Sequence, residues 1–120
     1  MTKEKASLVF DAARIELNFV ELAKAARDAG VTPLFALKSF PHPVVRELAA
    51  AHLTGFDAAS AGEIDTLAPR ADRILSVVDP SGAAVTTSWP GRLIVGVETP
   101  EQAAAAPARG PSGYTFITDP

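Results

Sequence analysis

The feature that most constrains the fold of this chain is an alternation of short apolar runs with segments of helical character. Five runs read as short strands, and glycine, proline or polar residues that favour turns bound each of them. The runs lie at residues 34–38, 55–59, 73–78, 92–97 and 114–118. The third and fourth are almost wholly apolar, which is typical of strands in a parallel sheet that is buried on both faces. The pattern predicts an α/β fold in which helices connect parallel strands.

Local signals also predict the helices. Asp11 is a plausible N-cap for a first helix, and Gly30 is the C-cap glycine at its other end. A second helix has Pro43 in its first turn and runs to Leu53. Shorter helices are expected at 62–67, 81–88 and 100–106, of which the middle one is weak because a glycine and two threonines lower its propensity. Strands that alternate with helices form either an open, doubly wound sheet or a curled barrel.

The composition excludes several classes of protein. The chain has 120 residues, of which 48% are hydrophobic and 21% charged, with a net charge of -3, so we expect one globular domain over residues 1–120. This balance attracts neither nucleic acid nor an anionic membrane, and no apolar stretch approaches the length of a membrane span. The absence of cysteine excludes disulfides, thiolate metal sites and a cysteine nucleophile. We therefore expect a cytoplasmic protein without a metal site.

Lys38 is the first candidate for chemistry, because it ends the apolar run that begins at Leu34. Taken alone, a lysine at the end of a strand more often extends its ammonium to water over its own methylenes. The alternative is that the apolar residues before it favour the neutral amine, which can form a Schiff base with an aldehyde. Evidence from neighbouring residues is needed to choose between a solvated lysine and a Schiff-base lysine.

Several polar side chains share the position of Lys38 relative to the predicted strands. In parallel α/β folds, ligands bind at the C-terminal ends of the strands. The loop after the first predicted strand, residues 39–43, contains no glycine, so dinucleotide binding is not expected. The polar residues at or just beyond the C-terminal ends of the predicted strands are Lys38, Asp57, Ser60, Asp79, Glu98 and Asp119.

Three stretches, Leu34–Ser39, Val45–Ala49 and Gly55–Ile64, together carry a resemblance. They resemble the N-terminal part of the barrel of the pyridoxal-phosphate-dependent ornithine, diaminopimelate and arginine decarboxylases, which are fold type III enzymes with an alanine-racemase-like barrel. In that family the lysine of an A-x-K motif holds the cofactor as an internal aldimine, and a G-x-D-x-x-S-x-x-E element lines the same pocket. The likeness continues more loosely through Arg73–Pro80 and Gly91–Glu101.

The resemblance implies a partial TIM (β/α) barrel of about five parallel strands, whose first strand carries the cofactor lysine. It implies that Lys38 is the catalytic residue and that Asp57, Ser60 and Glu63 also bind pyridoxal 5'-phosphate. Each of these three has a structural alternative. Asp57 or Ser60 could cap the helix that starts near Ala61, and Ser60 could form a capping box with Glu63.

The two histidines receive no chemical role. His42 is expected to be a loop or N-cap residue, and His52 lies near the end of a helix, where a partial positive charge suits the helix dipole. The histidine that stacks on the cofactor in the family belongs to a later strand, which the resemblance does not reach.

The departures from the family are as informative as the matches. A complete barrel of this type has eight strands in about 250 residues, so the C-terminal half of the barrel and the C-terminal β domain are not in this sequence. The glycine-rich phosphate loop, the acidic partner of the pyridine nitrogen and an arginine on the last strand have no counterpart. A lysine expected after the third strand is replaced by the segment Asp79–Gly82. An unclosed sheet leaves edges and one apolar face uncovered, which implies a partner or further sequence.

The expected function is therefore that of a lyase, a pyridoxal-phosphate-dependent amino-acid decarboxylase of polyamine or lysine biosynthesis. The chain would be a fragment of such an enzyme or one subunit of a split enzyme, inactive until the missing half is supplied. Its expected partners are an amino-acid substrate and either further copies of itself or a complementing second subunit. Two alternatives stay open: a non-catalytic half-barrel that acts as a binding or regulatory subunit, and a racemase-type enzyme on the same barrel.

Overall fold

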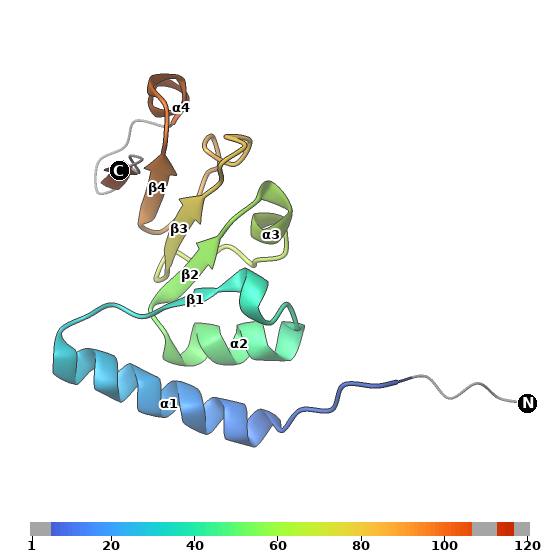
Figure 1. Cartoon of the computed structure of the whole chain (residues 1–120). Helices are drawn as coiled ribbons and strands as arrows, with labels where there is room; N and C mark the ends of the chain where they lie inside the picture. Colours follow the sequence, from blue (N-terminus) through green and yellow to red (C-terminus); the bar gives the residue numbers. More distant parts are fainter. Residues whose placement is uncertain (1–5, 107–112, 117–120) are drawn as a thin grey trace, which may run out of the picture.

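The structure is a computed structural model that describes residues 6–106 and 113–116, the latter by their backbone. Helices and strands alternate along the chain (Figure 1). The elements are α1 (Ala12–Ala29), β1 (Leu34–Ala36), the 3-10 turn η1 (Leu37–Ser39), α2 (Pro43–His52), β2 (Gly55–Ala58), α3 (Ala61–Asp65), β3 (Ile74–Val78), β4 (Leu93–Val97), α4 (Pro100–Ala105) and β5 (Gly113–Phe116).

The strands form one parallel sheet in the order β1-β2-β3-β4-β5. This spatial order is the order in the chain, so each new strand is added to the same edge. An open, doubly wound sheet reverses its strand order at a switch point, and the five described strands show no such reversal. The α/β class and the parallel sheet are confirmed, and the strand order is compatible with part of a barrel.

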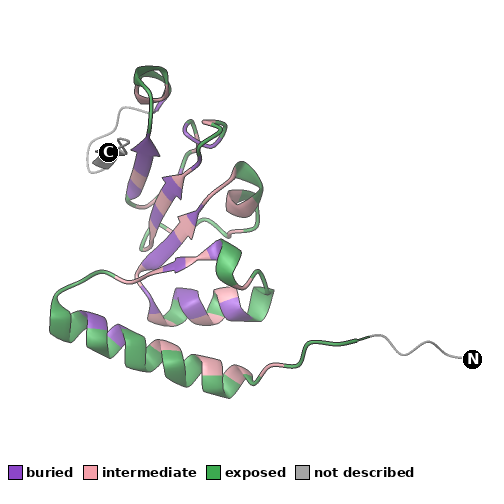
Figure 2. Cartoon of the chain, viewed as in Figure 1, coloured by how far each residue is buried: buried purple, intermediate pink, exposed green. Residues whose placement is uncertain are grey.

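The two faces of the sheet are buried to different extents (Figure 2). Successive residues of a strand point to opposite faces, and residues paired in register share a face. One row, formed by Phe35, Phe56, Leu75 and Leu93, is at most 9% exposed. The neighbouring row on the other face is formed by Ala36, Asp57, Ser76 and Ile94, all of which are only half-buried. The hydrophobic core therefore lies on one face, and we call the other the open face.

The core face is covered by α1, α2 and the segment between β3 and β4. Phe19 of α1 packs edge-on against Phe35, with ring centroids 5.7 Å apart. Val85 and Trp89 are buried in the same core, and the Trp89 indole nitrogen donates a 2.8 Å hydrogen bond to the carbonyl oxygen of Arg73. Burial of these apolar side chains is the main stabilising contribution to the fold.

The predicted caps of α1 and the predicted start of α2 are confirmed, whereas α2 ends at His52, one residue before the expected end. The Asp11 carboxylate accepts hydrogen bonds from the amides of Ala13 and Arg14, and Gly30 adopts the left-handed conformation with φ 71°. The N-cap of α2 is His42, whose Nδ1 accepts a 3.2 Å hydrogen bond from the amide of Val44. The interpretation of His42 as an N-cap residue is therefore correct.

Other predicted elements differ from the structure. Residues 81–88 form turns and not a helix, so three α-helices separate the strands in the described residues, where four helical segments were expected. The first strand ends at Ala36, and Lys38 lies in η1. The last strand was expected at 114–118; the structure has β5 at Gly113–Phe116, and residues 117 and 118 lie outside the described residues.

Candidate functional site

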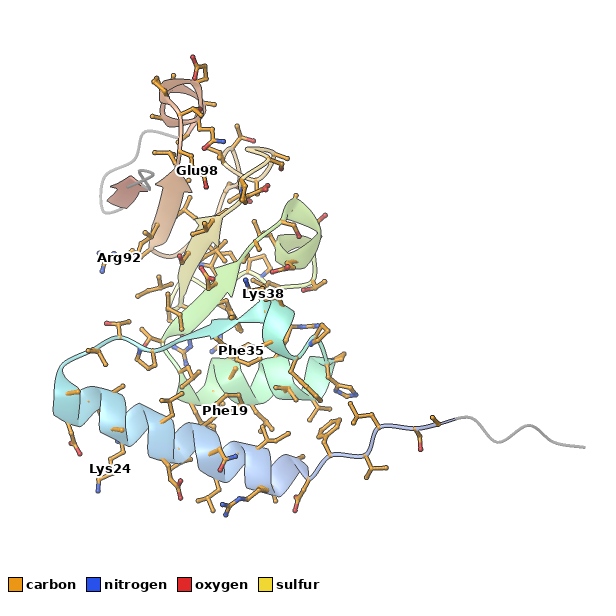
Figure 3. The ribbon with its side chains drawn as sticks, in the orientation of Figure 1. Phe19, Lys24, Phe35, Lys38, Arg92 and Glu98 are labelled. Atoms are coloured by element: carbon orange, nitrogen blue, oxygen red, sulfur yellow. The ribbon has the colours of Figure 1, made fainter. Side chains whose placement is uncertain are left out.

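Lys38 lies just beyond β1, at the C-terminal edge of the sheet (Figure 3). The Ser39 hydroxyl donates a 2.7 Å hydrogen bond to the carbonyl oxygen of Ala36 and closes the turn that holds Lys38. Leu37 is 2% exposed in the core, whereas Lys38 is exposed. Although η1 is no longer a strand, Leu37 faces the core and Lys38 faces away from it, on the side of the open face.

The expectation that the apolar residues before Lys38 surround its amine is wrong. Phe35 and Leu37, which precede it in the apolar run, are directed into the core on the opposite face. The side chain of Lys38 is exposed, so the described residues do not remove its amine from water. Any apolar enclosure of the amine has to come from a molecule or segment that covers the open face.

Asp57 lies on the open face, in the strand next to the one that Lys38 follows. It is in register with Ala36, the residue two positions before the lysine, and it is half-buried. Its carboxylate makes no hydrogen bond or ion pair with any side chain that the structure describes, and α3 is capped by another residue, Ser60. The alternative in which Asp57 caps this helix is therefore wrong, and its carboxylate is available to a ligand.

Ser60 and Glu63 instead hold the start of α3. The Ser60 hydroxyl accepts a 3.2 Å hydrogen bond from the Glu63 amide, and the Glu63 carboxylate accepts a 3.0 Å hydrogen bond from the amide of Ala59. This is the reciprocal arrangement of a capping box, with the second bond made one residue before the N-cap. The structure therefore shows Ser60 and Glu63 in the capping arrangement that the sequence offered as an alternative to cofactor binding.

A cavity of about 310 Å³ lies at the same end of the sheet, between the η1 loop, α2 and α3. Lys38 and Asp57 do not line it. The four predicted site residues thus fall into two pairs: Lys38 with Asp57 on the open face, and Ser60 with Glu63 at the start of α3. The cavity is lined by Leu37, Pro41, Arg46, Ser60, Gly62, Glu63 and Thr66.

Asp79 is a buried carboxylate to which the sequence interpretation gave no role beyond its place at a strand end. It is 7% exposed and accepts hydrogen bonds from the Ser81 hydroxyl at 2.7 Å, the Ser81 amide at 3.0 Å and the Ala84 amide at 2.9 Å. The hydroxyl of Ser81 and, after it, the two amides lower the pKa of Asp79, although burial acts in the opposite direction. Asp79 therefore anchors the 79–84 turns as an ionised group. An aspartate two residues before a serine is the signal from which this turn could have been read.

The other polar residues that the structure describes support no further centre, and Asp119 lies outside the described residues. The imidazole of His52 lies 3.8 Å from the Glu16 carboxylate, so this histidine links α2 to α1. Among the described residues, no three histidine or carboxylate side chains are close enough to hold a metal ion. No helix in the described part of the chain has the length and apolar character needed to cross a membrane.

The residues of the open face fit the attachment of an aldehyde cofactor, but only in part. Lys38 offers the accessible primary amine that attachment requires, and the Asp57 carboxylate makes no hydrogen bond within the described residues. The phosphate loop of the decarboxylases has no counterpart in the sequence. Lys38 would hold the cofactor and Asp57 would lie next to it. Comparisons of this chain with protein-family models, with curated proteins and with solved structures gave no match, so no family is assigned from them.

Proposed function

We propose that this chain is the N-terminal part of the cofactor-binding barrel of a pyridoxal-phosphate-dependent amino-acid decarboxylase, and that Lys38 is its cofactor lysine. One observation carries the proposal: Lys38 lies at the C-terminal edge of the sheet, on the open face, two residues beyond Ala36, which pairs with Asp57. The other lysine in the described residues, Lys24, lies on the exposed surface of α1 (Figure 3).

The chemistry assigned to the chain itself is that of a primary amine. In its neutral form the Lys38 nitrogen forms a carbon–nitrogen double bond to an aldehyde carbon, and the carbonyl oxygen leaves as water. When bound, pyridoxal phosphate supplies an electron sink for the electron pair left at the α-carbon of an amino acid after carbon dioxide departs. Once the substrate amine has displaced it, Lys38 can carry a proton on Nζ to that carbon.

The exposure of Lys38 determines what else the enzyme needs. Water that reaches the amine weakens every electrostatic interaction of the site and opens it to side reactions. The open face must therefore be covered for catalysis, and we propose that a complementing subunit, a further copy of the chain or further sequence provides the cover. Because the sheet has β1 and β5 as its edges, either edge can accept another strand.

A second function, a non-catalytic half-barrel that acts as a binding subunit, is favoured by a different observation. Ser60 and Glu63 satisfy amides at the N-terminus of α3. A chain that keeps the lysine but uses these two polar residues for structure would bind an aldehyde without turning over an amino acid.

An absorption titration with pyridoxal phosphate tests the cofactor assignment. We expect the purified chain to show a saturable spectral change that is lost in Lys38→Ala and kept in the control Lys24→Ala, which also removes an exposed lysine. Equal losses in the two variants would overturn the assignment. If binding depends on Lys38 but amino acids release no carbon dioxide even when the barrel is completed by a partner chain, the binding subunit is the correct function.

A further inference from the structure

The centre of the open face carries two polar side chains next to each other. Ser76 of β3 is in register with Asp57 of β2 on one side and with Ile94 of β4 on the other. The residues that flank Ser76 on the same face of its own strand are Ile74 and Val78. A carboxylate and a hydroxyl are thus placed together within a surface that is otherwise apolar around Ser76.

Neither polar group has a partner within the described residues. Both side chains are half-buried, and neither makes a hydrogen bond to a described residue, in contrast to the well-satisfied Ser60, Glu63 and Asp79 nearby. Covering a hydroxyl or a carboxylate without a hydrogen-bond partner is costly. A wholly apolar cover is therefore unfavourable over this pair, and whatever lies above it has to offer polar atoms.

The pair lies within reach of a group attached to Lys38. Neighbouring strands are about 4.8 Å apart and residues along a strand about 3.3 Å apart. Ser76 is two strands from Ala36, and Lys38 is two residues beyond Ala36, so extended spacing separates the Cα atoms of Lys38 and Ser76 by about 12 Å, and the 3-10 turn shortens this slightly. The four-carbon stem of the lysine covers about half of this span. The other half of this separation leaves room for one ring attached to Nζ of Lys38.

We infer that Ser76 is a positioning residue that, with Asp57, forms a polar floor beneath the group that Lys38 carries. This inference rests on the proposed function, and it narrows the ligand to an aldehyde on a ring with polar substituents. The Ser76 hydroxyl donates to or accepts from a polar substituent of the ring, and Asp57 accepts a hydrogen bond from a donor beside it.

Binding of pyridoxal phosphate by matched variants of Ser76 tests the inference. Ser76→Thr and Ser76→Val have the same shape and differ only in the hydroxyl, and Ser88→Ala removes a hydroxyl from an exposed loop position. Loss of one hydrogen bond should raise the dissociation constant of Ser76→Val by about three- to tenfold over that of Ser76→Thr. Ser88→Ala should bind as the wild type does. Thermal unfolding of each variant shows that the comparison is made between folded proteins.

The outcomes separate this inference from the proposed function. Equal dissociation constants for Ser76→Thr and Ser76→Val, with binding still dependent on Lys38, would refute the role of Ser76 alone. Wild-type binding that does not depend on Lys38 would refute the proposed function, and the role of Ser76 with it. Ser76→Ala offers a second comparison, because it should bind as weakly as Ser76→Val; wild-type affinity in this variant also overturns the inference.

Discussion

Gly55→Ala adds only one methyl group, yet the structure predicts a large loss of stability. Gly55 begins β2 and pairs with Ile74 of β3. A Cβ atom at this position would lie 2.7 Å from the carbonyl carbon and 2.8 Å from the amide nitrogen of Ile74. These are backbone atoms of the paired strand, so no side chain can rotate away to relieve the contact. Relief requires a shift of the β2–β3 ladder.

The expected magnitude follows from the nature of the contact. Overpacking a well-packed site costs about 1–3 kcal/mol, and a contact with backbone belongs at the upper end of that range. We therefore expect Gly55→Ala to lower the free energy of unfolding by about 3 kcal/mol. Since small domains are stable by only about 5–15 kcal/mol, this is a large fraction of the total.

Gly62→Ala is the matched control, because it adds the same methyl group where there is space. The nearest atom to its new Cβ is the Ser60 hydroxyl oxygen at 3.8 Å, and the residue lies in α3, where alanine is favoured over glycine by up to about 1 kcal/mol. Urea unfolding followed by circular dichroism gives both free energies. If Gly55→Ala is as stable as Gly62→Ala, the register of β2 and β3 described above is wrong.

Three further predictions concern the core, the 79–84 turns and the start of α2. Leu75→Ala, at a fully buried position, should cost about 2–5 kcal/mol in urea unfolding, and a loss below 1 kcal/mol would contradict its central place. Hydrogen bonds lower the pKa of Asp79, so its contribution to stability is complete above its unfolded pKa of about 4 and is lost as the pH falls through the folded value. The variant Asp79→Asn should lose this part of the acid dependence of unfolding. An unchanged dependence of stability on pH would argue against an ionised Asp79 as the anchor of the turns. His42→Ala removes the N-cap acceptor of α2 and should cost about 1 kcal/mol at neutral pH, whereas unchanged stability would show that the Nδ1 hydrogen bond contributes little.

Elements with strong local signals could be predicted from the sequence, and those set by distant contacts could not. The Asp11 and Gly30 caps define α1 because each acts within a few residues of its own position. The inward face of α1 could be predicted only in part. The spacing of apolar residues predicts a stripe that includes Leu17, Val20, Ala23 and Ala26. Ala23 and Ala26 are buried, but Leu17 and Val20 are 45% and 44% exposed, and Ile15 and Phe19 pack against the core. Apolar residues occur on both sides of this helix, and only tertiary packing selects one of them.

In the candidate site, too, features set by local signals could be predicted from the sequence and features set by distant contacts could not. Ser60 and Glu63 could be read in advance as a capping pair, since their spacing of three residues is itself the signal. The place of Lys38 at a strand end was predicted, but its exposure depends on which face of the sheet is covered. Ser76 could not be found from the sequence, because its position beside Asp57 follows from the register of two strands that are nineteen residues apart. The helix expected at 81–88 does not form, because the Asp79 carboxylate accepts hydrogen bonds from the amides of Ser81 and Ala84 and holds this segment in turns.

The central claim is that Lys38, and no other amine, is the attachment point of the cofactor. Its most direct test is to incubate the chain with pyridoxal phosphate, reduce with borohydride and locate the added mass by peptide mapping. We predict that, at limiting cofactor, the labelled fraction at Lys38 exceeds that at Lys24, which is also exposed but lies on α1 and not at the C-terminal edge of the sheet. A labelled fraction at Lys38 no greater than at Lys24 would contradict the account.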